Sequence, residues 1–187
     1  MNLRNSDQSW GIVTQFLHWF IFAFLIGQIT LGFVMGDFPD GDEKWKLFDL
    51  HKALGMLALL IIVLRLFWRF LNVVPKDPPM PNWQKKSAQG VIWALYLSML
   101  IIPISGYLMS TLGGHPIKIF DLFTIDPIMK NPAISKFANK VHEYMIWVII
   151  GFTAFHIVGG LYHHFILKDN ILRRMLPGWK DNNKKNK

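Results

Sequence analysis

The amino-acid sequence predicts an all-α integral membrane protein whose four transmembrane helices form a bundle. Of its 187 residues, 52% are hydrophobic and only 17% are charged, whereas soluble domains carry about a quarter charged residues. No Asp, Glu, Lys or Arg occurs in residues 8–36, 87–117 or 144–167. Each of these stretches exceeds the roughly 20 residues with which a helix crosses about 30 Å of hydrocarbon.

The spans leave only short connections between them. They are expected to cover about residues 12–35, 51–71, 88–112 and 142–167. Within the second span, Arg65 alone interrupts the apolar stretch 53–67, and a proline-rich linker follows that span. Because no room remains for a separate soluble domain, residues 1–187 are expected to form one transmembrane domain ending in a basic tail, residues 168–187.

The charges at the span ends predict the orientation of the chain. Cytoplasmic loops of membrane proteins are enriched in Lys and Arg. Basic residues gather in the tail and around the linker, whereas residues 36–50 hold five acids against two lysines. Both termini and the linker are therefore expected in the cytoplasm. The net charge of +8 fits attraction to an anionic lipid surface better than nucleic-acid binding.

The N-terminal apolar segment is expected to stay in the membrane. It is too long for the core of a signal peptide, and no small-residue cleavage site follows it. The sequence contains no cysteine, which excludes Fe–S clusters and thiolate-bound metals. Any metal must therefore be held by histidine, methionine or oxygen ligands.

Histidines fall at two matched depths in the predicted spans. His142 and His156 are 14 residues apart on the fourth span, a rise of about 21 Å that returns to the same helix face. With the expected orientation, His51 lies at the outer depth of His142, and His18 lies at the inner depth of His156. One intramembrane histidine alone is as readily a polar group bonded to a neighbouring helix. Two pairs from different helices instead predict two haem groups, each with its iron between two imidazoles.

Further residues are candidates for contacts with these groups. Arg65 lies 14 residues after His51, and a haem propionate is a natural partner for an arginine in the membrane. The alternative is that Arg65 extends to the cytoplasmic surface. His163 and His164 are candidates for bonding to a propionate or a quinone carbonyl, or else are solvated at a helix end. Gly32, at the outer depth, leaves room for a macrocycle or for simple helix packing.

Several motifs resemble the bacterial cytochrome b561 family of small di-haem inner-membrane proteins. They are Gln15–Trp19, Leu50–Lys52, Val141–Glu143, the stretch from His156 to Asn170, and Leu172–Pro177. The resemblance covers nearly the whole chain. It implies a four-helix bundle with two haem b groups in a bacterial inner membrane, and it implies as iron ligands His18, His51, His142 and His156.

The resemblance also implies electron transfer from a donor at the outer face to ubiquinone, and one activity in the family oxidises superoxide. Six-coordinate haems favour outer-sphere transfer, so no side chain is expected to act as a catalytic residue. Lysines of the third loop could attract superoxide, although the acidic first loop opposes this; they are Lys118, Lys130, Lys136 and Lys140. Two alternatives are an electron-carrying membrane anchor for a partner dehydrogenase or hydrogenase, and a non-redox haem-binding or sensing protein.

Overall fold

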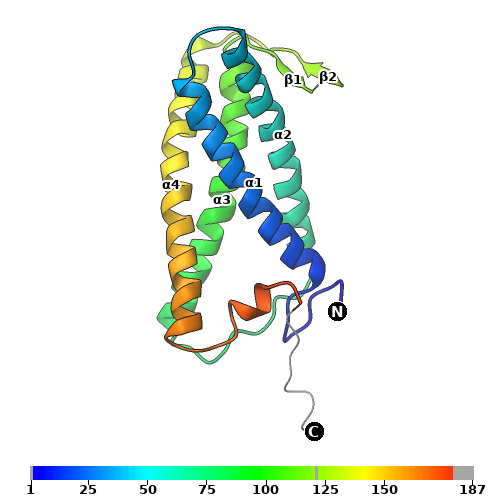
Figure 1. The fold of residues 1–187 in the computed structure, drawn as a ribbon, viewed down its shortest axis with the longest axis vertical. Helices are drawn as coiled ribbons and strands as arrows, with labels where there is room; N and C mark the ends of the chain where they lie inside the picture. The colour runs from blue at the N-terminus through cyan, green and yellow to red at the C-terminus, as the bar shows by residue number, and fades with distance from the viewer. Residues whose placement is uncertain (1, 121, 179–187) are drawn as a thin grey trace. The chain divides into compact units, whose positions relative to one another are not determined.

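A computed structural model describes residues 2–120 and 122–178 of the chain, and it is dominated by four long helices (Figure 1). In chain order the elements are α1 (Ile12–Asp37), α2 (Asp42–Phe70), α3 (Asn82–Leu112), β1 (Ile117–Ile119), β2 (Phe123–Ile125), α4 (Pro132–Phe165) and a 3₁₀ turn (Arg173–Met175). All four α-helices are long and apolar enough to cross a membrane. The predicted fold class, a four-helix membrane bundle, is confirmed.

Two helices begin well before the apolar spans expected from the sequence. The helix α2 begins with Asp42 and Glu43 in its first turn, where acidic side chains favour the positive end of the helix dipole. The helix α4 begins at Pro132, and the backbone N–H of Ile134 donates to the Asn131 side chain at 3.2 Å. Asn131 thus caps a helix whose first residue is proline, a favoured combination. These polar first turns extend beyond the apolar segments.

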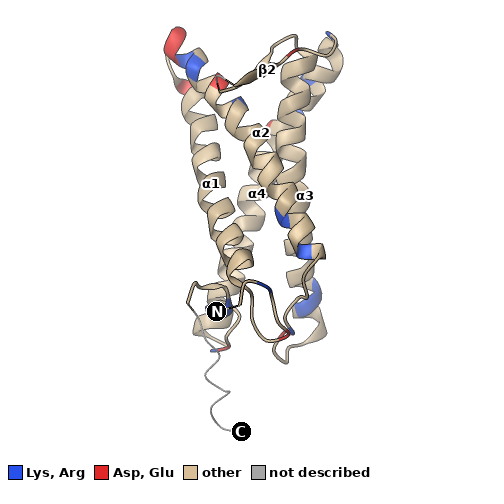
Figure 2. Cartoon of the chain, turned by 90° about the vertical axis from the view of Figure 1, so that its right-hand side faces the viewer, with Lys and Arg blue, Asp and Glu red and all other residues tan. Residues whose placement is uncertain are grey.

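Apolar side chains cover the outside of the helices. In the most apolar window of each helix, between 6% and 22% of the residues are buried inside the protein. Figure 2 shows that most of the helix length carries no charge, while acidic residues gather where α1 connects to α2. A surface of this kind is unfavourable in water and is suited to lipid chains.

The chain divides into two compact units, and each contains a segment of every helix. Unit 1 comprises residues 1–20, 63–95 and 151–187, and unit 2 comprises residues 21–62 and 96–150. The part of the predicted basic tail that covers residues 179–187 lies outside the described residues.

In unit 1, the segments outside the helices are tied together by hydrogen bonds. The side-chain amide of Gln15 donates to the main-chain oxygen of Arg174 at 3.0 Å, and the Trp19 indole donates to that of Met175 at 2.8 Å. Arg174 in turn donates to the main-chain oxygen of Lys76 at 2.9 Å. The residues that follow α4 are therefore fastened both to α1 and to the linker between α2 and α3.

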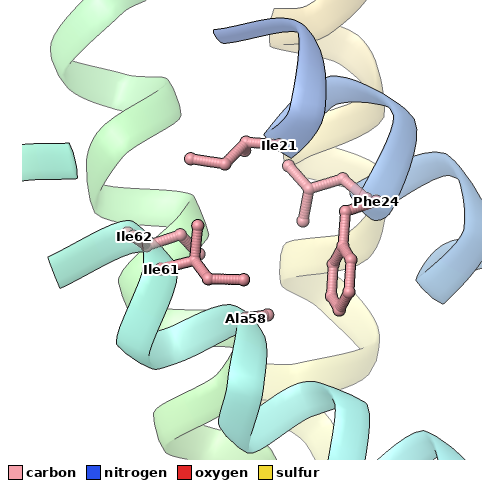
Figure 3. A pocket seen from close by; sticks show the side chains of 6 residues that line it. Ile21, Phe24, Ala58, Ile61 and Ile62 are labelled. Carbon is pink, nitrogen blue, oxygen red and sulfur yellow. The ribbon is translucent and has the colours of Figure 1, made fainter. Parts of the chain in front are cut away.

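In unit 2, the helices α1 and α2 meet in an apolar contact. Ile21, Phe24, Ala58 and Ile62 line a small apolar pocket between them (Figure 3). Its lining offers no polar group to a ligand, so this pocket belongs to helix packing.

A short antiparallel hairpin, β1–β2, occupies part of the connection between α3 and α4 (Figure 1). The sequence predicts only a loop there. Ile117 of β1 is 1% exposed. Lys52 of α2 donates to the main-chain oxygen of Pro116 at 3.0 Å, and Asp49 of α2 pairs with Lys118 of β1 at 3.3 Å. The hairpin is thereby fixed to the first turns of α2.

Candidate haem sites

In unit 2, the imidazole rings of His51 on α2 and His142 on α4 face each other. Their ring centres are 6.3 Å apart, and their planes cross at 84°. An imidazole nitrogen binds a metal at about 2.0–2.1 Å. Because the ring centre lies roughly 1 Å beyond that nitrogen, two imidazoles on opposite sides of one metal have centres about 6 Å apart. The spacing of this outer pair, His51 and His142, fits one iron atom between the rings.

The outer pair lines a cavity inside unit 2. Other walls are formed by residues of all four helices, among them Ile29, Ala58, Met99 and Ile146. The lining is predominantly aliphatic, and Gln28 is one of its few polar members. A mostly apolar cavity with a few placed polar groups is typical of cofactor sites, and it suits a flat apolar macrocycle.

The orientation of His142 is set by α3. Its Nδ1 atom lies 2.8 Å from the main-chain oxygen of Ile102, and a carbonyl oxygen can only accept. The proton is therefore on Nδ1, which leaves Nε2 free to bind iron. Gly106 makes this position possible, since a Cβ atom there would lie 3.2 Å from Cε1 of His142.

The ring of His51 faces α1. A Cβ atom at Gly32 would lie 3.4 Å from Cε1 of His51, so the missing side chain gives room to the imidazole. At this glycine the sequence predicts room for a macrocycle or for helix packing. The side-chain amide of Gln28 donates to the main-chain oxygen of His51 at 3.2 Å. Sequence reasoning missed Gln28, although a polar amide in an apolar span is a signal of helix-to-helix bonding.

In unit 1, His18 on α1 and His156 on α4 form the inner pair. Their ring centres are 6.0 Å apart, and their planes cross at 51°. His18 is half-buried and His156 is exposed. This spacing, too, fits one iron atom between two imidazoles.

Arg65 lies beside the inner pair, where α2 brings it to His18. Its Nη2 atom is 3.1 Å from Nδ1 of His18, and its Nη1 atom donates to the main-chain oxygen of Leu17 at 3.4 Å. Arginine can only donate, so Nδ1 of His18 is the acceptor of this hydrogen bond. The spacing of Arg65, 14 residues after His51, predicts the depth of the inner pair, and the structure brings it to these histidines.

The end of α4 holds His163 in a hydrogen bond that the sequence analysis did not foresee. Nδ1 of His163 lies 2.5 Å from Oδ2 of Asp169, and the other carboxylate oxygen accepts from the backbone N–H of Ile171 at 3.0 Å. Neighbouring His164 packs its ring edge-on to Phe165, with ring centres 4.8 Å apart. His115 is exposed in the loop after α3.

Among the described residues, no group of three or more His, Cys, Asp or Glu side chains could hold a bare metal ion. Facing pairs of imidazoles supply only two axial ligands. They therefore suit an iron atom whose other four ligands come from a porphyrin.

Apolar spanning helices that carry pairs of neighbouring imidazoles are typical of a b-type membrane cytochrome. The sequence matches the family model described as Prokaryotic cytochrome b561 over residues 9–178. The chain belongs to this family. It is therefore a haem b electron carrier and a multi-pass protein of the bacterial inner membrane.

The similarity to known relatives extends over most of each chain. Cytochrome b561 homolog 2 of Escherichia coli K12 is 32% identical over 181 residues, which cover 94% of this chain and 95% of the relative. Cytochrome b561 homolog 1 of the same organism is 29% identical, with 87% and 93% covered. A Yersinia pestis protein named "Probable superoxide oxidase CybB" is 24% identical, with 86% and 92% covered.

Proposed function

We propose that this cytochrome binds two haem b groups and passes electrons from a donor at the outer face to ubiquinone. One haem lies between His51 and His142, and the other lies between His18 and His156. The two facing imidazole pairs, with ring centres 6.3 Å and 6.0 Å apart, are the observation that carries this proposal. Both termini lie in the cytoplasm, in agreement with the lysines and arginines around the tail and linker.

The ligand residues favour electron transfer over ligand binding at iron. Each haem, when bound, supplies a one-electron carrier whose two axial positions are already filled by histidine. In each pair the two imidazoles come from different helices. The hydrogen bond from His142 to Ile102 fixes His142 in the tautomer that binds iron through Nε2. Two histidines at each haem would leave no position on the iron for an outside ligand.

Arg65 is proposed to bind a propionate of the inner haem. A histidine that binds iron through Nε2 carries its proton on Nδ1. His18 then has no acceptor for the guanidinium that now lies 3.1 Å from its Nδ1. A positive charge inside a membrane protein favours an anionic partner. A propionate carboxylate supplies this charge.

His163 and His164 are proposed to serve ubiquinone at the cytoplasmic end of α4. Reduction of the quinone to quinol takes two electrons and two protons. Asp169 accepts the hydrogen bond of His163 Nδ1, which leaves Nε2 as the nitrogen that would exchange a proton with the quinone. His164 is the adjacent candidate for bonding the quinone carbonyl. The protons come from cytoplasmic water.

Superoxide is proposed as the outer donor. The name of the Yersinia pestis relative, probable superoxide oxidase, supports this choice, as do Lys130 before α4 and the two lysines in the first turns of α4. Each superoxide would lose one electron and leave as O₂, so two are needed for each quinol. Lys130, Lys136 and Lys140 carry the attraction in this proposal, because Lys118 is paired with Asp49 at 3.3 Å.

A spectrum of the purified protein tests the haem sites. We expect two low-spin b-type haems per chain in the dithionite-reduced minus oxidised spectrum with haem quantitation. The His51→Ala and His18→Ala variants should each lose a different haem. A single haem per chain, or loss of the same haem in both variants, would overturn the proposed ligand pairs.

Turnover then tests the reaction. The isolated protein should reduce a soluble ubiquinone analogue when superoxide is generated enzymatically, with its haems cycling between both oxidation states. Reduction that required a co-purifying dehydrogenase would instead identify the chain as an electron-carrying anchor subunit. Haems that could not be reduced at physiological potentials would support a sensing role.

A further inference from the structure

Two buried polar atoms in the cavity of the outer pair lack a hydrogen-bond partner within the described part of the chain. They are Oε1 of Gln28 and Nδ1 of His51. Both residues line the same cavity, and Gln28 is only 8% exposed. Buried polar atoms are nearly always hydrogen-bonded in folded proteins, so each of these two atoms calls for a partner.

The amide of Gln28 is already fixed beside His51. Its nitrogen donates to the main-chain oxygen of His51 at 3.2 Å. A carbonyl oxygen needs a donor, and this requirement determines which end of the amide is nitrogen. The other end, Oε1, is therefore an acceptor held next to the same histidine.

The edge of the His51 ring that carries Nδ1 faces the helix of Gln28. A Cβ atom at Gly32, one turn after Gln28 on α1, would lie 3.4 Å from Cε1 and 3.9 Å from Nδ1 of His51. When the ring binds iron through Nε2, its proton is on Nδ1. Iron binding therefore makes Nδ1 of His51 a hydrogen-bond donor, on the side of the ring where Gln28 of α1 carries its acceptor Oε1.

The other outer ligand shows the same arrangement in completed form. His142 donates from Nδ1 to Ile102 on α3, and Gly106, four residues later, leaves room for its ring. On α1, Gln28 and Gly32 have the same separation of four residues. We propose that Gln28 is the positioning residue of His51, accepting its Nδ1–H while donating to its main-chain oxygen.

This inference rests on the proposed haem between His51 and His142. A hydrogen bond accepted from the second nitrogen of an iron-bound imidazole makes the ligand more basic, which favours ferric iron and lowers the reduction potential. Loss of the acceptor should therefore raise the potential of the outer haem. A loss of polarity in the cavity would also raise the potential, whereas the low-spin EPR signal responds to the hydrogen bond on the ligand and so distinguishes the two causes.

The experiment is a potentiometric titration of the purified holoprotein and its variants, with haem quantitation and a low-spin EPR spectrum. Gln28→Leu removes the acceptor, whereas Gln28→Glu keeps an oxygen in its place. The matched control is Gln15→Leu, which alters the other buried glutamine of α1, 4% exposed and bonded in unit 1 to the main-chain oxygen of Arg174. The outer haem is identified as the component that His51→Ala removes.

Gln28→Leu should raise the midpoint potential of the outer haem alone and shift its EPR signal. Gln28→Glu should leave that potential at or below its original value, and Gln15→Leu should leave it unchanged. Loss of the outer haem in Gln28→Leu but not in Gln28→Glu would also support the proposal, since second-shell changes weaken metal binding by about 10- to 100-fold.

Three results would overturn the role of Gln28. They are an unchanged potential with full haem content in Gln28→Leu, an equal rise in both Gln28 variants, or loss of the outer haem in both. Failure of the haem assignment itself is distinguishable, because His51→Ala would then retain both haems.

Discussion

Nδ1 of His142 donates to the main-chain oxygen of Ile102 across 2.8 Å, which links α4 to α3 beside the outer cavity. The hydroxyl of Ser105 donates to the same oxygen, also at 2.8 Å. This oxygen belongs to the residue that precedes Pro103, inside a helix that continues to Leu112. The main chain of α3 thus sets both the tautomer and the direction of a proposed iron ligand, with no charged side chain.

The fit of His142 against α3 predicts that Gly106→Leu will lose the outer haem. A Cβ atom at this position would lie 3.2 Å from Cε1 and 3.3 Å from Nδ1 of the imidazole. A leucine side chain would therefore force the ring away from its acceptor. Haem content of the purified variant should fall from two per chain toward one, and Gly106→Ala should show a smaller loss.

Gly90 on the same helix provides the control for this prediction. A Cβ atom there meets no atom of the described residues within 4 Å. Gly90→Leu should therefore keep both haems. Equal haem loss in the Gly90 and Gly106 variants would show that the effect comes from α3 itself and not from crowding of His142.

The position of Arg65 predicts a shift in the potential of the inner haem. A positive charge near a haem stabilises its reduced form, so removal of the guanidinium in Arg65→Gln should lower the midpoint potential of the component that His18→Ala removes. Arg65→Lys keeps the charge and should shift it less. Potentiometric titration measures both.

Arg69, one turn further along α2, offers a comparison because its guanidinium lies over the Trp93 ring, 5.8 Å from the ring centre. Arg69→Gln should leave the inner potential closer to its original value than Arg65→Gln does. An equal or larger shift in the Arg69 variant would contradict a specific contact of Arg65.

The sequence predicted the four helices because charged residues are costly in lipid, so their absence from residues 8–36 or 144–167 is a strong signal. Hydropathy does not report where helices continue beyond the membrane, and for this reason α2 and α4 begin earlier than expected. The three-residue strands of the hairpin are too short to show a period.

Some of the candidate site residues could also be predicted from the sequence, because polar side chains stand out in apolar spans. Histidines are conspicuous in apolar spans, and their spacing along one helix is known from helix geometry. Gln28, Gly106 and Asp169 could not be selected in this way. Their roles depend on how neighbouring helices are rotated, or on how the chain turns back after α4, and neither is encoded in a spacing along one helix.

The bond between His163 and Asp169 predicts a defect in quinone reduction without haem loss. His163→Gln removes the proposed proton carrier, and Asp169→Asn weakens its orientation. General acid–base groups contribute about 100- to 10,000-fold, so His163→Gln should slow quinone reduction at least tenfold. Asp169→Asn should give a smaller decrease. Stopped-flow measurement of haem reoxidation by a ubiquinone analogue tests both variants.

His115→Gln is the control, because this histidine is exposed in the loop after α3. It should leave haem reoxidation unchanged. If His163→Gln instead lost a haem, the residue would be a ligand or a structural support. Normal reoxidation in both variants, with both haems present, would remove His163 and Asp169 from the quinone site.

Finally, superoxide should reduce the haems more slowly when Lys130 and the lysines in the first turns of α4 are neutralised. Steering by charge raises association rates by about 10- to 1,000-fold and falls with ionic strength. The triple variant Lys130→Gln, Lys136→Gln and Lys140→Gln should therefore reduce the rate and flatten its dependence on salt. The matched control is the triple variant Lys130→Arg, Lys136→Arg and Lys140→Arg, which keeps the three positive charges and should keep both the rate and its dependence on salt. If the original protein showed no salt dependence, superoxide would not be guided by these lysines, and a neutral donor would become the better hypothesis for the outer face.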